Sequence, residues 1–147
     1  MKKEKVREFT FLLDLVRMNL ASREYEHSLR VMQYVMCNPL IPEEIHDDCI
    51  CAAIAHDLLE DSRVEARQLS VSCSPNVLNA IKLLTKPENM SYEAYIKEIK
   101  RNSLLPTGGT IAYWVKMADM KDHLAQSSTL TDALKEKYLN ALPYLMP

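Results

Sequence analysis

Glycine is rare in this chain. The 147 residues contain only two glycines, and these are adjacent at positions 108 and 109. Tight β-hairpin turns usually need residues with positive φ, which glycine adopts at the least cost. We therefore predict an all-α fold.

Apolar spacing and helix-start signals locate the expected helices. Val6, Phe9, Leu13, Val16 and Leu20 recur at steps of three and four, as one face of a helix requires. No repeat, low-complexity tract or linker divides the chain, so we expect a single domain over residues 1–147. The predicted helices cover about residues 6–20, 24–36, 42–60, 75–84, 92–100, 110–125 and 132–142.

Charge and hydropathy exclude several classes of protein. The chain has 18 Lys and Arg against 20 Asp and Glu, a net charge of −2. It therefore lacks the excess of basic residues that is typical of nucleic-acid-binding proteins. The longest wholly apolar stretch, residues 49–55, falls far short of the roughly 20 residues that cross a bilayer. We expect neither a nucleic-acid nor a membrane partner.

No export signal precedes the four cysteines, which predicts reduced core thiols and a cytoplasmic location. They are Cys37, Cys49, Cys51 and Cys73.

Ionisable residues directly follow the apolar stretch at 49–55. In a continuous helix, His56 would lie one turn before Glu60, and Asp57 one turn before Asp61. These pairs would form two adjacent rows, and their burial without a partner would be costly, so a cation is a natural partner. The alternative is a helix that reaches the surface at this end and exposes its charges.

Two other segments carry candidate ligands. Lys116, Asp119 and His123 share one face of a predicted helix, although they would also suit ordinary solvated ion pairs. His27 lies near the start of another helix, where a lone histidine is more often packed or at the surface. Two imidazoles and two carboxylates, on three helices, would suit a divalent Mn, Fe or Zn ion. The candidate ligands are His27, His56, Asp57 and Asp119.

Several short strings resemble one known family. Residues 27–31 (HSLRV) are similar to its H-P-L-R-V, 56–62 (HDLLEDS) to H-D-V-V-E-D-T, and 83–86 (LLTK) to A-L-T-K. Residues 116–119 (KMAD) are similar to its K-L-A-D. Over about residues 20–145, the chain thus resembles the HD superfamily of metal-dependent phosphohydrolases. Within this superfamily, the chain resembles the RelA/SpoT type of hydrolase domain, including its small stand-alone bacterial forms.

This resemblance implies an enzyme with an HD-domain helical bundle. One divalent ion, usually Mn²⁺ in this branch, would be bound by the four candidate ligands, and Glu60 and Asp61 would be the catalytic pair. The implied reaction releases pyrophosphate from the 3′ position of guanosine tetra- or pentaphosphate, so the expected partner is a small phosphorylated nucleotide. A nearby carboxylate such as Glu60 could orient water or move its protons.

The chain departs from the family pattern at two substrate-contacting positions. The family's basic R-K-x-x-G-x-P-Y segment is replaced by residues 18–26, in which only Arg23 is a candidate substitute. The asparagine of K-L-A-D-x-x-x-N is His123 here. Arg23 and His123 are therefore candidate substrate contacts, and the guanosine specificity stays open. The alternatives are hydrolysis of another nucleotide or phosphomonoester, or a regulatory module that binds a nucleotide without turnover. The oligomeric state is also open.

Two further patterns have simpler explanations than ligand binding. Acidic residues at 43–48 suit the first turn of a helix, where the helix dipole favours negative charge. Residues 107–110 (TGGT) lack the spacing and lysine of a phosphate-binding loop. We therefore expect residues 43–48 to begin a helix, and residues 107–110 to form a turn with a helix cap.

Overall fold

The computed structural model describes residues 1–126 and 128–147, and throughout this part of the chain the regular elements are α-helices, without a strand. The all-α prediction is confirmed. The helices are α1 (Lys3–Asn19), α2 (Ser22–Met36), α3 (Glu43–Ala55), α4 (Leu58–Asp61), α5 (Ala66–Leu69), α6 (Pro75–Leu83), α7 (Tyr92–Arg101), α8 (Gly109–Ala125) and α9 (Asp132–Leu145).

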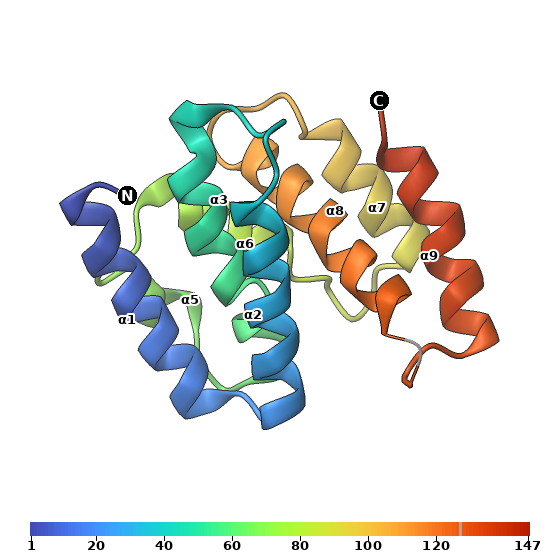
Figure 1. Ribbon diagram of the computed structural model, residues 1–147, viewed down its shortest axis with the longest axis horizontal. Helices are drawn as coiled ribbons and strands as arrows, with labels where there is room; N and C mark the ends of the chain where they lie inside the picture. The colour runs from blue at the N-terminus through green and yellow to red at the C-terminus, as the bar shows by residue number, and fades with distance from the viewer. Residues whose placement is uncertain (127) are drawn as a thin grey trace.

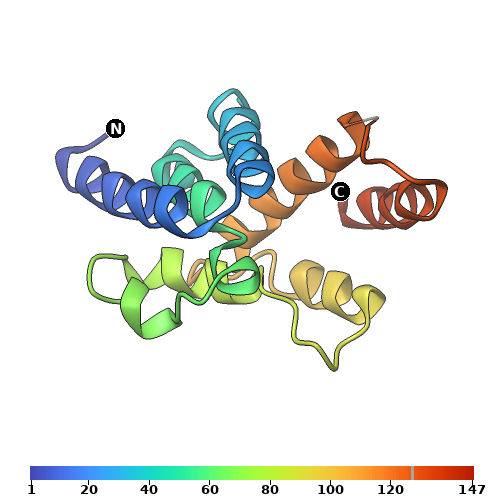
Figure 2. The same ribbon diagram turned by 90° about the horizontal axis from the view of Figure 1, so that it is seen from below.

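Helices α3 and α8 form the centre of the arrangement. Helix α3 packs against α1, α2, α6 and α8, while α8 also contacts α7 and α9. Figure 1 shows α8 running between α2 and α7, and Figure 2 shows α1 to α3 on one side of the molecule with α5 to α7 on the other. Residues carried by α2, α3 and α8 are therefore brought together at the centre.

The apolar stretch of α3 is buried on every side. All seven residues from Cys49 to Ala55 are buried, as expected for a helix without a polar face. Leu58 and Met120, outside this stretch, are fully buried in the same continuous core. Each such side chain contributes about 1.5–3 kcal/mol on removal from water. A packed core thus surrounds the end of α3 where His56 begins.

Helix α1 is rotated relative to the predicted apolar face. Leu12 and Val16 are fully buried, whereas Val6 is 47% exposed. Glu8 takes a place on the buried face because Lys5 Nζ and the Ser74 backbone N–H donate to its carboxylate, at 2.9 and 3.0 Å. An acidic residue with two donors can occupy a position that periodicity alone assigns to an apolar side chain.

The cysteine prediction is correct for three of the four residues. Cys49, Cys51 and Cys73 are buried free thiols. Cys37 is also free but exposed, because it lies just past the C-terminal end of α2, so its assignment to the core was wrong. In the described part of the chain, no helix is long and apolar enough to cross a membrane.

The predicted helix over 42–60 is interrupted, which corrects the expectation of two rows of ionisable side chains. Helix α3 ends at Ala55 and α4 begins at Leu58. Asp57, with φ −100° and ψ 1°, leaves the helical region. The His56 backbone N–H turns to Ala53 O at 3.4 Å, and the His56 ring Nδ1 lies 2.7 Å from the same oxygen. The side-chain hydrogen bond thus stabilises the break.

Two smaller differences concern helix extent. Helix α5 was not predicted, although Glu65 and Gln68 form a reciprocal capping box at its start, a spacing visible in the sequence. Helix α9 continues through Pro143 to Leu145 rather than ending at residue 142. Other boundaries agree within a few residues, and the predicted cap Ser91 accepts a hydrogen bond from the Ala94 N–H.

The glycine pair forms the predicted turn and cap before α8. Gly108 has φ +134°, a conformation that residues with a Cβ rarely adopt. A Cβ on Gly109 would lie 1.8 Å from the backbone oxygen of Asn102. Both glycines are therefore explained by backbone geometry and close packing.

Candidate metal centre

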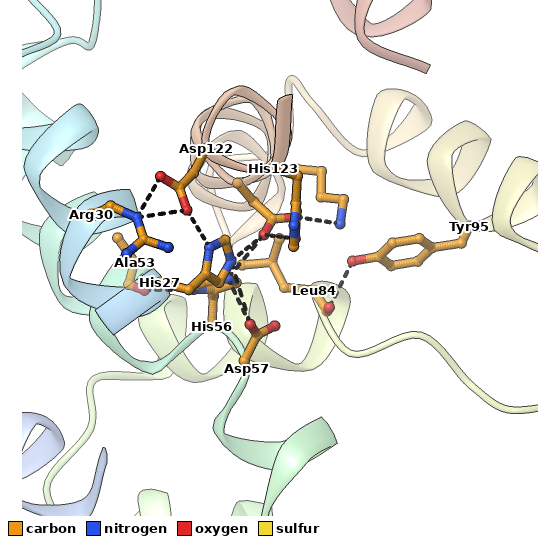
Figure 3. Close-up of polar contacts among 11 residues, drawn as sticks. His27, Arg30, Ala53, His56, Asp57, Leu84, Tyr95, Asp122 and His123 are labelled. Carbon is orange, nitrogen blue, oxygen red and sulfur yellow. Dashed lines mark hydrogen bonds and ion pairs between the residues drawn. The ribbon is translucent and has the colours of Figure 1, made fainter. Parts of the chain in front are cut away.

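Four side chains from separate parts of the sequence meet between α2, α3 and α8. His27 comes from α2, His56 and Asp57 from the break between α3 and α4, and Asp119 from α8. One potential ligand atom from each residue lies within 4.8 Å of those of the other three. We refer to these four residues as the ligand cluster, three of which are labelled in Figure 3. They are the same four that the sequence nominates.

Asp119 Oδ1 is the central atom of the ligand cluster. It lies 2.8 Å from His27 Nε2 and 3.2 Å from His56 Nε2. Asp57 Oδ2 lies 3.2 Å from His56 Nε2 and 3.7 Å from His27 Nε2. His27, His56 and Asp119 are buried, and Asp57 is half-buried. The alternative of a helix end that exposes all its charges is therefore wrong for His56 and Asp57.

The helix break is what lets two consecutive residues serve one site. Successive side chains on a continuous α-helix point about 100° apart. The change of backbone direction at Asp57 instead brings its carboxylate beside the His56 ring. The sequence string His-Asp therefore supplies two converging ligand atoms only in this irregular conformation.

Hydrogen bonds fix the orientation of both buried imidazoles. His27 Nδ1 lies 2.7 Å from Asp122 Oδ2, and Arg30 Nε donates to the same carboxylate at 2.8 Å (Figure 3). His56 Nδ1 lies 2.7 Å from Ala53 O. Because a carboxylate and a carbonyl can only accept, each Nδ1 carries a hydrogen atom.

The orientation of these rings makes the ligand cluster suited to a cation. A neutral imidazole has one N–H, so the Nε2 atoms of His27 and His56 are left with lone pairs. Both lone pairs then face Asp119 Oδ1, which is itself an acceptor. Such an arrangement is repulsive unless protons or a cation lie between the groups. Imidazoles fixed by a carboxylate or carbonyl in this way are typical of metal sites.

Opposite charges within the ligand cluster favour the ionised form of both the imidazoles and the carboxylates. Burial opposes protonation of His27 and His56, but Asp119 and Asp57 outweigh it, and the pKa of His27 is raised and that of His56 raised well above its usual value. Burial works against the ionised form of Asp119, yet the charge of Lys116 helps hold its pKa well below the usual range. Without a cation, the imidazoles therefore favour proton uptake, and protons compete with metal for the same nitrogen atoms.

Lys116 binds the far side of the Asp119 carboxylate. Its Nζ donates to Asp119 Oδ2 at 2.7 Å, and both side chains are buried. The ammonium also lies 5.0 Å from the centre of the Tyr95 ring, within the range of a cation–π contact. The solvated ion pair considered from the sequence is thus wrong for these two residues. Lys116 occupies Oδ2 and leaves Oδ1 facing the histidines.

Glu60 and Asp61 are exposed on the short helix α4, which directly follows Asp57 of the ligand cluster. We refer to these two residues as the rim of the site. Partial burial and the negative charge of Asp57 raise the pKa of Glu60. The same two causes raise the pKa of Asp61 to about 6. Carboxyl groups that titrate closer to neutral pH are suited to proton transfer.

A cavity of about 390 Å³ adjoins the ligand cluster. Arg23, His27, Arg30, His123 and Tyr138 are among the residues that line it. The two candidate substrate contacts, Arg23 and His123, thus face the same cavity as one member of the cluster. Its volume suits a small molecule.

Sequence reasoning missed Asp122 as the partner of His27 and Arg30. Asp122 is fully buried and lies three residues after Asp119 on α8. An i, i+3 pair of aspartates on a mostly apolar helix was the signal that could have found it. The partnership itself depends on the packing of α8 against α2, which no local spacing encodes.

The acidic segment at the start of α3 has structural contacts instead of a ligand cluster. His46 Nε2 lies 2.9 Å from Val35 O, and Asp48 is paired with Lys5. Within the described residues, no second group of metal-ligating side chains comparable to the ligand cluster is found. The expectation of an ordinary helix start is consistent with these contacts.

Comparison with known proteins gives a match at the level of fold. No protein-family model matches the sequence, and a search of curated proteins gave no match. A solved structure, reported as a metazoan ortholog of SpoT that hydrolyzes ppGpp and plays a role in starvation responses, is similar with a TM-score of 0.67. The match covers 99% of this chain and 84% of that one, at 15% sequence identity. The chain therefore has the HD-type helical fold expected from the resemblance.

Proposed function

We propose that this chain is a metal-dependent phosphohydrolase acting on a small phosphorylated nucleotide. The observation that carries the proposal is the convergence of two oriented imidazoles and two carboxylates within 4.8 Å. Its fold is shared with a protein reported to hydrolyze ppGpp. In full, the proposed reaction is the release of pyrophosphate from guanosine tetra- or pentaphosphate. The proposed cofactor is one divalent ion, Mn²⁺ by resemblance, with Fe or Zn equally suited to the donors.

The ligand cluster and its supporting residues prepare the site for an ion. The chemistry that a divalent ion supplies when bound is activation of water and neutralisation of phosphate charge. Asp122 holds His27 with Nε2 directed into the site, and the Ala53 carbonyl does the same for His56. Lys116 restrains Asp119 through its other oxygen. The side chains are therefore pre-organised by contacts that do not occupy the ligand atoms.

Glu60 and Asp61 are the proposed catalytic acids at the rim. Their raised pKa values favour proton exchange with water and with a leaving phosphate near neutral pH. Because both are exposed, a substrate at the mouth of the site can reach them. We assign Glu60 to orienting the attacking water, and Asp61 to assisting proton movement.

Lysines next to the ligand cluster provide positive charge for phosphate groups. Burial and the charges of Lys116 and Lys86 lower the pKa of Lys137. The positive charges of Lys116 and Lys86 also act on Glu60, where they oppose the rise of its pKa. Like charges gathered in this way favour an anionic ligand.

A second candidate substrate class is favoured by the cavity beside His27. Arg30 Nε is already committed to Asp122, and an acidic residue, Glu26, lines the same cavity. Because Asp122 partly neutralises Arg30 and Glu26 adds a negative charge, this side offers limited positive charge to a highly charged nucleotide. This balance favours a nucleotide or phosphomonoester with fewer phosphates than guanosine tetraphosphate.

The deciding experiment measures metal content and then product release on the same sample. Purified protein is analysed for bound metals and incubated with guanosine tetraphosphate and Mn²⁺, with parallel reactions on other nucleotides and phosphomonoesters. Pyrophosphate release that stops on chelation is the expected result. Release from other substrates alone would select the second class. Stoichiometric metal without turnover of any substrate would overturn the enzyme assignment in favour of a binding module, and absence of metal under every loading condition would overturn the metal centre.

Variants separate metal binding from catalysis. We expect His56→Ala to lose metal and turnover together, and Glu60→Gln to keep the metal while losing turnover. Glu44→Gln is the matched control, because Glu44 is exposed in the first turn of α3, at the opposite end from His56. Full activity of Glu60→Gln would remove this residue from the mechanism.

A further inference from the structure

His123, which the sequence resemblance assigns to a substrate contact, also lies beside the central atom of the ligand cluster. Its Nε2 lies 3.2 Å from Asp119 Oδ1, the same distance as His56 Nε2. Together with His27, three imidazole Nε2 atoms surround one carboxylate oxygen. An oxygen with two lone pairs cannot accept three good hydrogen bonds. A cation shared by the three nitrogen atoms and the carboxylate would account for the arrangement.

Packing holds the His123 ring in this orientation. The ring is stacked on Tyr138, with centroids 4.8 Å apart and planes 2° from parallel. On its other neighbour, His27, the ring centroids are 4.5 Å apart. Tyr138 is itself buried, so α9 provides a fixed platform for a residue of α8. The position of Nε2 is therefore set by packing as well as by its contact with Asp119.

The spacing on α8 is also appropriate for chelation. Asp119 and His123 are four residues apart, so they lie on the same face one turn from each other. The same i, i+4 relation places two ligands on one zinc ion in helical metal sites. With its side chain about one-third exposed, His123 lies where the ligand cluster opens to the cavity.

We propose that His123 is a fifth protein ligand of the metal, bound through Nε2. This inference rests on the proposed metal centre and extends it from two imidazoles to three. A third imidazole increases the nitrogen character of the site and favours Zn²⁺ or Fe²⁺ over Mn²⁺, which prefers oxygen ligands. His123 is then a determinant of metal choice in addition to lining the cavity.

Histidine NMR tests the proposal on the unaltered protein. The chain has four histidines, so long-range ¹H–¹⁵N spectra can follow each imidazole in chelator and with one equivalent of Zn²⁺. We expect the Nε2 signals of His27, His56 and His123 to move to metal-bound positions, and that of His46 to stay. Movement of only the first two would overturn the role of His123 while leaving the metal centre intact. Movement of none would overturn the metal centre itself.

Affinity measurements on variants provide an independent test. By calorimetry, His123→Ala should weaken Zn²⁺ binding by at least about tenfold, and His123→Asn should reduce the preference for Zn²⁺ over Mn²⁺. His46→Ala is the matched control, since its imidazole contacts the Val35 carbonyl away from the site. Circular dichroism confirms that each variant is folded. Unchanged Zn²⁺ affinity in both His123 variants would contradict the proposal.

Discussion

Asp122 Oδ2 lies 2.7 Å from Nδ1 of His27, although 95 positions separate the two residues in the sequence. The aspartate is fully buried, and its second oxygen accepts a hydrogen bond from Arg30 Nε at 2.8 Å. The contact joins α8 to α2 and determines which nitrogen of His27 faces the ligand cluster. The same interaction thus links two helices and orients a proposed metal ligand.

Removal of this carboxylate should weaken metal binding. We expect Asp122→Ala to lower the affinity for Zn²⁺ by about 10–100-fold, the usual effect of losing the partner of a metal-bound histidine. Calorimetric titration of Zn²⁺ into the metal-free protein measures this affinity. Asp14→Ala, at an exposed position on α1, is the control and should bind as the parent does. Equal affinities in the two variants would show that Asp122 does not orient His27 for metal binding.

The stability of the protein should depend on pH in opposite ways with and without metal. The pKa values of His27 and His56 are raised in the folded protein. In chelator, the stabilisation from their protonation is therefore complete below about pH 6.5, the unfolded value, and is lost as the pH rises through the folded pKa values. Bound metal requires neutral imidazoles, so its stabilisation grows over the same interval.

Thermal melts between pH 6.5 and 9 test this prediction. In the presence of a chelator, the melting temperature should fall as the pH rises. The melting temperature in excess Zn²⁺ should exceed that in chelator by a margin that grows with pH. Replacing both histidines by Gln should flatten this part of the pH response in chelator. Parallel curves with and without metal would be inconsistent with a shared site for protons and metal.

Gly109 should not tolerate a side chain. A Cβ at this position would lie 1.8 Å from the Asn102 backbone oxygen and 2.7 Å from its carbonyl carbon. Because these are backbone atoms, relief requires movement of the chain at the start of α8. We expect Gly109→Ala to reduce the free energy of unfolding by about 3 kcal/mol or more, as measured by urea denaturation. A change below about 0.5 kcal/mol would contradict the tight packing at this turn.

Thiol reactivity should distinguish one cysteine from the other three. Burial raises the pKa of Cys49, Cys51 and Cys73 to about 12, which leaves almost no thiolate at pH 8. Cys37 is exposed. With Ellman's reagent, we expect one rapidly reacting thiol in the folded protein and four in denaturant. Cys37→Ser should remove the rapid phase, and its persistence would place another thiol at the surface.

Local sequence patterns were sufficient to predict most of the helices. The scarcity of glycine, the three-and-four spacing of apolar residues and the Ser91 cap depend on contacts within a few residues of the chain. The errors occurred where a distant contact competes with local preference. Glu8 is buried on α1 because Lys5 and the Ser74 backbone satisfy its carboxylate.

The candidate site shows the same division. By itself, the sequence determined the helical class and nominated His27, His56, Asp57 and Asp119, because periodicity and residue chemistry are local properties. Only the tertiary structure decided that the chain breaks at Asp57, that these ligand atoms meet within 4.8 Å, and that Asp122 and Tyr138 support the histidines around them. The physical reason is that such convergence depends on how α2, α8 and α9 pack around the end of α3. That packing is set by burial of the whole core, which no single segment encodes.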